Sequence, residues 1–163
     1  MAGIPIYQTA IQPEWIDFNG HLRDAYYTLI FSLGVDALMD RVGLDAPYRQ
    51  RTRCTLYTVE IHLHYLRELK HSDTAAVQVR ILGADHKRIH AAFELSRAGD
   101  AVVAAAAEAM LLHVRQDGET VKSAPFPGEV SAAIAQLRSA TAGMESSVPG
   151  SRRMQLRSAG GTA

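Results

Sequence analysis

A carboxylate and a Gly-His pair stand at the start of the longest apolar, helix-like segment of this chain. Asp17 lies three residues before Gly20, and His21 follows directly. If the apolar segment is a helix, its first turn carries free amide groups and a partial positive charge. Such amides can hold a developing oxyanion while the carboxylate attacks, or activates a water molecule that attacks. Asp17 and His21 are therefore candidate catalytic residues.

Each of these residues also has a structural interpretation. Asp17 can be an N-cap or an Asx-turn residue, and without further information we favour that reading. His21 can orient a reacting group or pack at the helix start with a hydrogen bond, and the two readings stand about even. For Asp24 we prefer a structural role, because acidic side chains are favourable in the first turn of a helix.

The hydrophobic pattern predicts the elements that must position these residues. Residues 22–42 are mostly apolar, which predicts a helix buried on several sides, and Gly34 within it indicates a close approach by another backbone. The alanine run at 104–107 favours a helix by propensity, but its valine-rich flanks and the preceding turn favour a strand. A short amphipathic helix follows from the spacing of Val130, Ile134 and Leu137. Strands are expected over residues 4–12, 54–66, 73–83, 88–97 and 101–114, with a polar loop at 44–53.

Composition limits the class of protein. The 163 residues suffice for one domain, which we expect over residues 1–142, followed by a Gly/Ser/Arg-rich tail at 143–163 that we expect to be mobile. Acidic and basic residues balance at 17 each, so nucleic acid is not an expected partner. No apolar run approaches the roughly 20 residues of a membrane span, and no signal peptide is visible. With Cys54 as its single cysteine, the chain is expected to be cytoplasmic and not to associate with membranes.

The order of elements predicts an α+β fold. One strand, a long buried helix and four further strands suit a curved antiparallel sheet that wraps around the helix and buries it on most sides. One helix cannot cover every face and edge of such a sheet. We therefore expect the chain to pair with a second copy, as a homodimer or a dimer of dimers.

This order of elements, with Asp17, Gly20, His21 and Tyr27 at the helix entrance, resembles the hotdog fold. More narrowly, it resembles the 4-hydroxybenzoyl-CoA thioesterase-like acyl-CoA hydrolases, although Arg23-Asp24 stands where many members have an Asn pair. The resemblance covers roughly residues 7–114. It implies hydrolysis of an acyl-CoA thioester to free CoA and a carboxylate, with an acyl-CoA substrate as the partner and no metal or cofactor. Asp17 would serve as nucleophile or general base.

The resemblance also implies which residues bind the substrate. The carbonyl oxygen would be bound by backbone amides at the helix entrance, those of Leu22, Arg23, Asp24 and Ala25. The segments 14–27, 36–41 and 110–114 are similar to the betainyl-CoA thioesterases of carnitine catabolism, whose acyl group carries a trimethylammonium cation. An aromatic or acidic pocket would suit that cation, and basic residues would suit the phosphates of CoA. The candidates are Trp15, Tyr26, Tyr27, Tyr57, Tyr65 and Glu60 for the acyl group, and Lys87 and Arg88 for the phosphates.

Three alternatives remain open from the sequence. The chain could hydrolyse another short-chain or aromatic acyl-CoA. It could also bind acyl-CoA without catalysis. A hydratase or dehydratase on the same fold is a further alternative, but the spacing from Asp17 to His21 argues against it.

Overall fold

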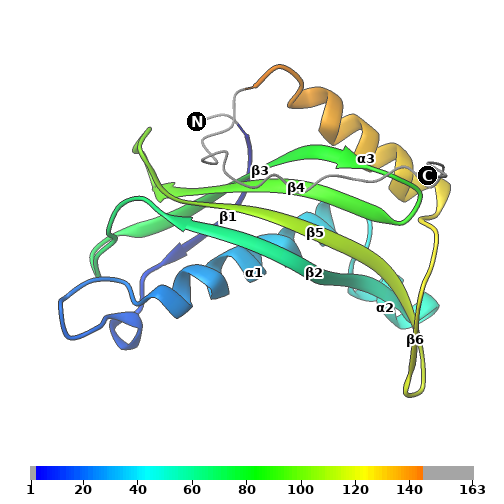
Figure 1. The fold of residues 1–163 in the computed structure, drawn as a ribbon, viewed down its shortest axis with the longest axis horizontal. Coiled ribbons are helices and arrows are strands. Elements are labelled where there is room, and N and C mark those ends of the chain that lie inside the picture. The colour runs from blue at the N-terminus through cyan, green and yellow to red at the C-terminus, as the bar shows by residue number, and fades with distance from the viewer. Residues whose placement is uncertain (1–2, 145–163) are drawn as a thin grey trace, which may run out of the picture.

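A computed structural model describes residues 3–144, and the chain forms one curved antiparallel sheet with three α-helices over that range (Figure 1). The strand order is β1-β3-β4-β5-β2, and β6 pairs with β5. This architecture confirms the predicted α+β fold. The elements are β1 (Ile4–Ala10), the 3-10 turn η1 (Pro13–Trp15), α1 (Asp24–Arg41), α2 (Ala46–Thr52), β2 (Cys54–Tyr65), β3 (Thr74–Ala84), β4 (Arg88–Arg97), β5 (Val103–Asp117), β6 (Thr120–Ser123) and α3 (Gly128–Ala140).

Helix α1 is the centre of the fold. Its buried residues recur every three or four positions, so one broad face packs against the concave side of the sheet (Figure 1). Phe31 of α1 meets Phe93 of β4 edge to face, with 6.4 Å between ring centroids. A Cβ atom on Gly34 would lie 3.1 Å from Cγ1 of Val77, so the close approach is to a side chain of β3 and not, as predicted, to another backbone. The glycine lets α1 lie close to the sheet.

Strand β3 alternates between buried and partly exposed residues, whereas β4 is buried at eight consecutive positions, residues 89–96. On β4, Ile89, Ala91, Phe93 and Leu95 join the core and are fully buried. The alanine run at 104–107 lies within β5, which confirms the strand prediction. Helix α3 packs against β3, and Val130, Ile134 and Leu137 join the same core, as their spacing predicted.

Several predicted elements differ in the structure. The long helix begins at Asp24 rather than at residue 22, β1 ends at Ala10 rather than at residue 12, and β5 continues to Asp117 rather than ending at residue 114. β6 is an additional strand. The predicted loop at 44–53 contains α2, because Asp45 caps this helix by accepting a hydrogen bond from the Tyr48 amide at 2.8 Å. Pro47 signalled a loop, but proline is compatible with the first turn of a helix, where its missing amide proton costs nothing.

In the strand order β1-β3-β4-β5-β2, β1 lies at one edge and β2 at the other. β2 has twelve residues and exposes the apolar side chains of Tyr57, Val59 and Ile61. A long apolar edge strand is a template for pairing with another chain. None of the helices within residues 3–144 is long and apolar enough to cross a membrane. The predicted tail, from residue 145 onward, lies outside the described residues.

Candidate active site

The loop between η1 and α1 holds the carboxylate of Asp17. Oδ1 of Asp17 accepts hydrogen bonds from the amides of Asn19 at 2.8 Å and His21 at 3.2 Å. The backbone closes the same loop, since the Asp17 amide donates to the His21 carbonyl at 2.9 Å. Gly20 adopts a φ of +81°, which favours glycine at this turn. Asp17 is thus an Asx-turn residue, and its Oδ2 accepts no hydrogen bond from any residue in the described range.

This hydrogen bonding affects the charge of Asp17. The His21 amide holds the pKa of the Asp17 carboxyl below its ordinary value against a smaller opposing effect of burial, and the Asn19 amide lowers this pKa further. The carboxylate is therefore ionised at neutral pH. A fixed carboxylate with one oxygen available for a reactant can act as a base or as a nucleophile.

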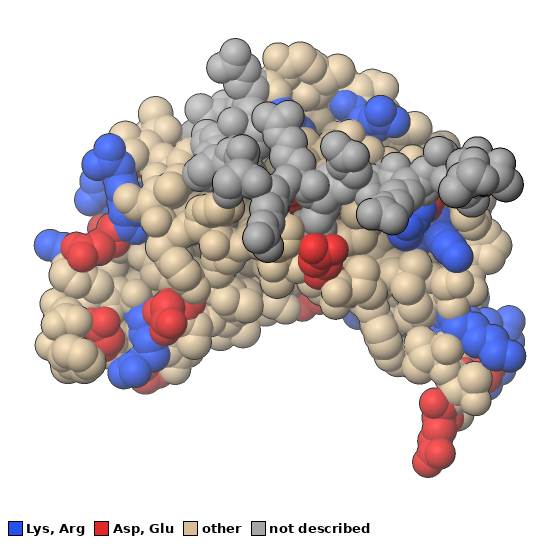
Figure 2. All heavy atoms as spheres, viewed as in Figure 1, with Lys and Arg blue, Asp and Glu red and all other residues tan. Residues whose placement is uncertain are grey.

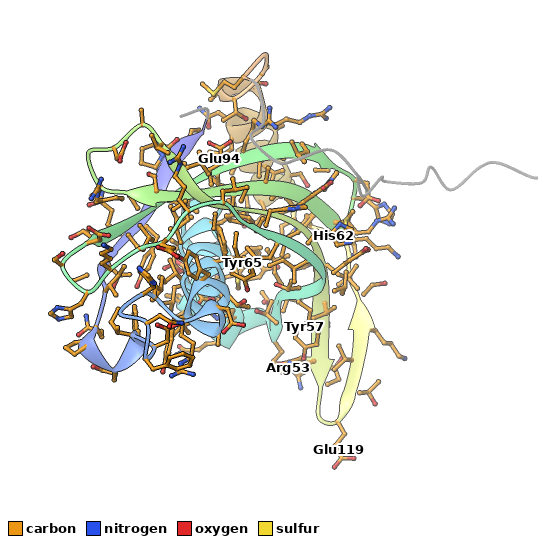
Figure 3. The ribbon with its side chains drawn as sticks, turned by 60° about the vertical axis from the view of Figure 1, so that its left-hand side comes forward. Arg53, Tyr57, His62, Tyr65, Glu94 and Glu119 are labelled. Atoms are coloured by element: carbon orange, nitrogen blue, oxygen red, sulfur yellow. The ribbon has the colours of Figure 1, made fainter. Side chains whose placement is uncertain are left out.

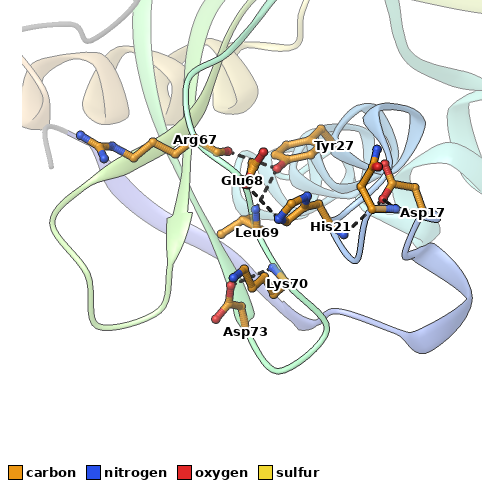
Figure 4. Close-up of polar contacts among 9 residues, drawn as sticks. Asp17, His21, Tyr27, Arg67, Glu68, Leu69, Lys70 and Asp73 are labelled. Carbon is orange, nitrogen blue, oxygen red and sulfur yellow. Dashed lines mark hydrogen bonds and ion pairs between the residues drawn. The ribbon is translucent and has the colours of Figure 1, made fainter.

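Asp17 lines a groove of about 550 Å³ between this loop and the chain that leaves β2. Figure 4 shows the two walls, with Asp17 and His21 on one side and the segment from Arg67 to Lys70 on the other. The groove is lined by Asp17, Phe18, Asn19, His21, Leu22, Arg23, Asp24, Tyr27, Tyr65, Leu66, Arg67 and Glu68.

The amides at the helix entrance are not equally available. The Leu22 amide donates to the Leu69 carbonyl at 2.7 Å, and the Arg23 amide donates to the Trp15 carbonyl at 3.0 Å. The Ala25 amide donates to Oδ1 of Asp24 at 2.9 Å. The Asp24 amide has no partner among the described residues and stands at the first position of α1. Of the four predicted oxyanion donors, Asp24 is therefore the amide best placed to bind a substrate oxygen.

His21 is held by a residue that the sequence did not indicate. Its Nε2 lies 2.9 Å from Oε2 of Glu68, which is largely exposed on the opposite wall of the groove (Figure 4). Tyr27 fixes that wall, because its hydroxyl donates to the Arg67 carbonyl at 3.2 Å and accepts from the Leu69 amide at 3.1 Å. Glu68 lies between these two anchored residues.

The structure brings only some of the predicted substrate residues to the groove. Tyr27 lines it, whereas Trp15 and Tyr26 do not; their rings stack on each other at 5.3 Å and join η1 to the first turn of α1. Glu60 is an exposed residue of β2 that pairs with His62 at 3.0 Å. Trp15 therefore acts in this structure as a packing residue of the loop.

Lys87 and Arg88 also lie away from this groove. They belong to the hairpin between β3 and β4, at the end of the sheet where α1 ends, whereas the Asp17 loop lies at the other end (Figure 1). Arg88 pairs with Asp85 at 2.6 Å, and Nζ of Lys87 lies 3.2 Å from Oγ of Ser123. Within one chain these cations cannot serve the groove that holds Asp17.

Two other cations line the groove itself. Arg23 and Arg67 come from its opposite walls, and neither forms an ion pair with a residue in the range 3–144. Figure 2 shows charged side chains toward both ends of the visible face. Arg23 and Arg67 are thus additional candidates for contacts with phosphate groups.

The fold is that of the hotdog acyl-CoA thioesterases. The Thioesterase-like superfamily matches residues 11–134, a range that includes the Asp17 loop and both walls of the groove. The chain belongs to this superfamily, which confirms the resemblance seen in its sequence.

Individual relatives of this chain are also thioesterases. A betainyl-CoA thioesterase of Pseudomonas aeruginosa is 46% identical to this chain over 134 residues, which are 82% of this chain and 83% of the relative. An L-carnitine dehydrogenase/betainyl-CoA thioesterase of Rhizobium meliloti is 35% identical over 129 residues, which are 79% of this chain and 25% of that larger relative.

Solved structures share the fold over nearly the whole chain. The crystal structure of a proposed thioesterase from Pseudomonas putida KT2440 has a TM-score of 0.78 and 42% identity, covering 96% of this chain and 99% of the other. A Staphylococcus aureus protein in complex with CoA has a TM-score of 0.77 and 30% identity, covering 91% and 98%.

Proposed function

We propose that this chain hydrolyses betainyl-CoA to glycine betaine and free CoA in carnitine degradation. The observation that carries the proposal is the 46% identity to the betainyl-CoA thioesterase of Pseudomonas aeruginosa over 82% of this chain. The Rhizobium meliloti relative bears the name of the same thioesterase together with that of L-carnitine dehydrogenase, which supports the link to carnitine.

The proposed reaction uses Asp17 and the first amide of α1. Water supplies an oxygen atom to the carbonyl carbon, the carbon–sulfur bond breaks, and CoA leaves as a thiolate that takes up a proton. Asp17 acts as general base on the water or first attacks the carbonyl itself, and both routes give the same products. Its lowered pKa provides the ionised form that either role needs. The Asp24 amide donates to the carbonyl oxygen, which gains negative charge as the bond to the nucleophile forms.

His21 has a supporting role in this proposal. Its imidazole faces the groove and is held by Glu68 at 2.9 Å, so it can orient the thioester beside Asp17. No metal is needed, because a thioester carbonyl is electrophilic and a thiolate is a good leaving group. Arg23 and Arg67, which line the groove, are the cations that we assign to the phosphates of CoA.

We further propose that two copies join along β2. The exposed apolar side chains of Tyr57, Val59 and Ile61 on this edge strand support such pairing, which removes the edge from solvent. Lys87 and Arg88 could contact CoA in this groove only if a second copy carried them there. A dimer of dimers, as expected from the sequence, would be built from the same pair.

A thiol-release assay tests the function. Betainyl-CoA, acetyl-CoA and an aromatic acyl-CoA are each mixed with the protein, and free CoA is followed with a thiol reagent. We expect CoA release with the highest kcat/KM for betainyl-CoA. Release only from another ester would change the assigned substrate, and saturable binding without release would indicate a binding module.

Light scattering of the purified chain tests the oligomeric state. Cell fractionation tests the expected cytoplasmic location.

A further inference from the structure

We propose that the ring of Tyr65 binds the trimethylammonium group of the substrate. This inference rests on the proposed function, because it assigns the recognition of the acyl group to one wall of the same groove. Tyr65 is the last residue of β2 and lines the groove together with Asp17. Figure 3 shows its side chain beside α1, away from Arg53 at the other end of the strand.

The ring of Tyr65 has an available face. It meets Tyr27 edge to face, with 5.3 Å between centroids and 85° between planes. A contact of this kind covers at most one face of a ring. Because 52% of the Tyr65 surface is exposed, the ring is open to a ligand in the groove, whereas Tyr27 is 4% exposed and is not. A cation bound over the face of a tyrosine within about 6 Å of its centroid is attracted by the ring.

The position of Tyr65 relative to the reacting atoms suits this ligand. Its hydroxyl lies 3.4 Å from the carbonyl oxygen of Asp24, the residue whose amide is the proposed oxyanion donor. In betainyl-CoA the quaternary nitrogen is separated from the carbonyl carbon by one methylene, that is by two single bonds of about 1.5 Å each. A carbonyl group bound at the Asp24 amide therefore places the cation within the same part of the groove as Tyr65.

The charges of the groove support a cation there. The amino end of α1 carries partial positive charge and would repel the trimethylammonium group. The carboxylates of Asp17 and Asp24 line the groove and attract the cation, whereas the Glu68 carboxylate is held by His21. Arg23 and Arg67 are assigned to the phosphates at the other end of the substrate. An uncharged acyl group would gain nothing from these carboxylates, so the subsite selects for the cation.

The test compares two esters of the same shape. Betainyl-CoA and 3,3-dimethylbutyryl-CoA differ only in replacement of the quaternary nitrogen by carbon, so their kcat/KM ratio measures recognition of the charge. We expect wild-type protein to prefer betainyl-CoA, and Tyr65→Leu to reduce this ratio about tenfold, as expected for loss of a cation–π contact in a partly desolvated site. Tyr65→Phe keeps the ring and is expected to keep most of the preference.

A second measurement does not depend on the folding of Tyr65→Leu, because it uses wild-type protein. Tetramethylammonium ion is expected to inhibit wild-type hydrolysis of betainyl-CoA competitively. It is expected to inhibit Tyr65→Phe with a similar inhibition constant. An equal loss of activity toward both esters in Tyr65→Leu, or an absence of inhibition by tetramethylammonium, would overturn the subsite while leaving the thioesterase function intact. Absence of CoA release from betainyl-CoA by wild-type protein would overturn the proposed function, and the subsite with it.

Discussion

The hydroxyl of Tyr27 accepts a hydrogen bond from the amide of Leu69 at 3.1 Å, although the two residues lie 42 positions apart. The same hydroxyl donates to the Arg67 carbonyl at 3.2 Å. Burial raises the pKa of the Tyr27 hydroxyl, so the group remains a neutral donor and acceptor at physiological pH. One side chain of α1 thereby fixes the backbone on both sides of Glu68.

We predict that Tyr27→Phe weakens both the fold and the site. The buried Leu69 amide loses its partner, which is expected to cost about 1–3 kcal/mol of unfolding free energy. The loosened segment should also lower kcat. Chemical denaturation and CoA release measure the two effects. Tyr7→Phe is the matched control, because the Tyr7 hydroxyl forms no hydrogen bond within residues 3–144; an equal loss in both variants would contradict the role of Tyr27.

Asp17→Asn should abolish most turnover without unfolding the protein. The amide oxygen of asparagine can still accept from Asn19 and His21, so the turn is kept, but the charge needed for catalysis is lost. We expect kcat to fall about a hundredfold to ten-thousandfold, as for loss of a general base. Steady-state CoA release checks the rate, and thermal unfolding checks the fold.

The control for this variant is Asp36→Asn, an exposed change on α1 outside the groove. It should leave kcat and the melting temperature unchanged. If Asp17→Asn retains wild-type turnover, Asp17 has only its structural role in the turn.

The lowered pKa of Asp17 predicts the pH dependence of catalysis. The ionised carboxylate is the active form, so kcat/KM should be insensitive to this group at neutral pH and fall as pH decreases through the lowered pKa. The midpoint of the acidic limb of the kcat/KM profile should therefore lie below the ordinary pKa range of an aspartate. Initial rates measured over short intervals, with stability checked at each pH, give this midpoint. A midpoint above that ordinary pKa range would contradict the hydrogen-bonding argument.

Glu68→Gln is expected to lower kcat while leaving KM and stability nearly unchanged. The polar contact with His21 is largely exposed on the Glu68 side, so its contribution to stability is at most about 1 kcal/mol. Its role in our proposal is to orient the imidazole. Glu14→Gln, on exposed η1, serves as the control. A fall in melting temperature that fully accounts for the lost activity would show that Glu68 is structural only.

His113 predicts a pH effect on stability that is separate from the groove. Nδ1 of this buried histidine donates to the Ala124 carbonyl at 2.9 Å, and Nε2 lies 3.0 Å from the Tyr48 hydroxyl. Burial lowers the pKa of His113, so the folded protein holds it neutral while the unfolded chain takes up a proton below about pH 6.5. The free energy of unfolding is therefore unaffected by the titration of His113 above that pH, and it decreases as the pH falls from that value to the lowered pKa.

Urea unfolding between pH 5 and pH 8 measures this effect. We expect the wild-type free energy of unfolding to decrease below about pH 6.5, by at most about 1.4 kcal/mol per pH unit from this one group. His113→Asn is less stable at every pH but lacks this part of the slope. Identical slopes for the two proteins would contradict the assignment.

The main elements of the fold could be predicted because their signals are local. The apolar spacing of α1, the alternation of β3 and the turn at Gly20 are all encoded within a few residues. The position of Trp15 depends on a local feature as well. This candidate for the acyl group ends the 3-10 turn η1, where its ring stacks on Tyr26 and lies outside the groove.

The far wall of the groove could not be predicted from the sequence, although Tyr65 is a candidate for the acyl group. Tyr65 ends β2, which pairs with β5, and Arg67 and Glu68 follow it. These residues line the groove of Asp17 only because the sheet curves around α1. No spacing within residues 65–68 signals this. The anchoring role of Tyr27 depends on the same long-range contact.

The bonds between the Leu22 amide and the Leu69 carbonyl, and between the Arg23 amide and the Trp15 carbonyl, join main-chain atoms only. These attachments therefore do not depend on the side chains at positions 22 and 23, although proline is excluded at both and the buried Leu22 side chain also belongs to the core. Side chains that merely line the groove, such as Phe18 and Leu66, are then free to diverge while the frame that carries them persists. Within such a frame, an ancestral hydrolase can acquire a new acyl preference through a few surface substitutions.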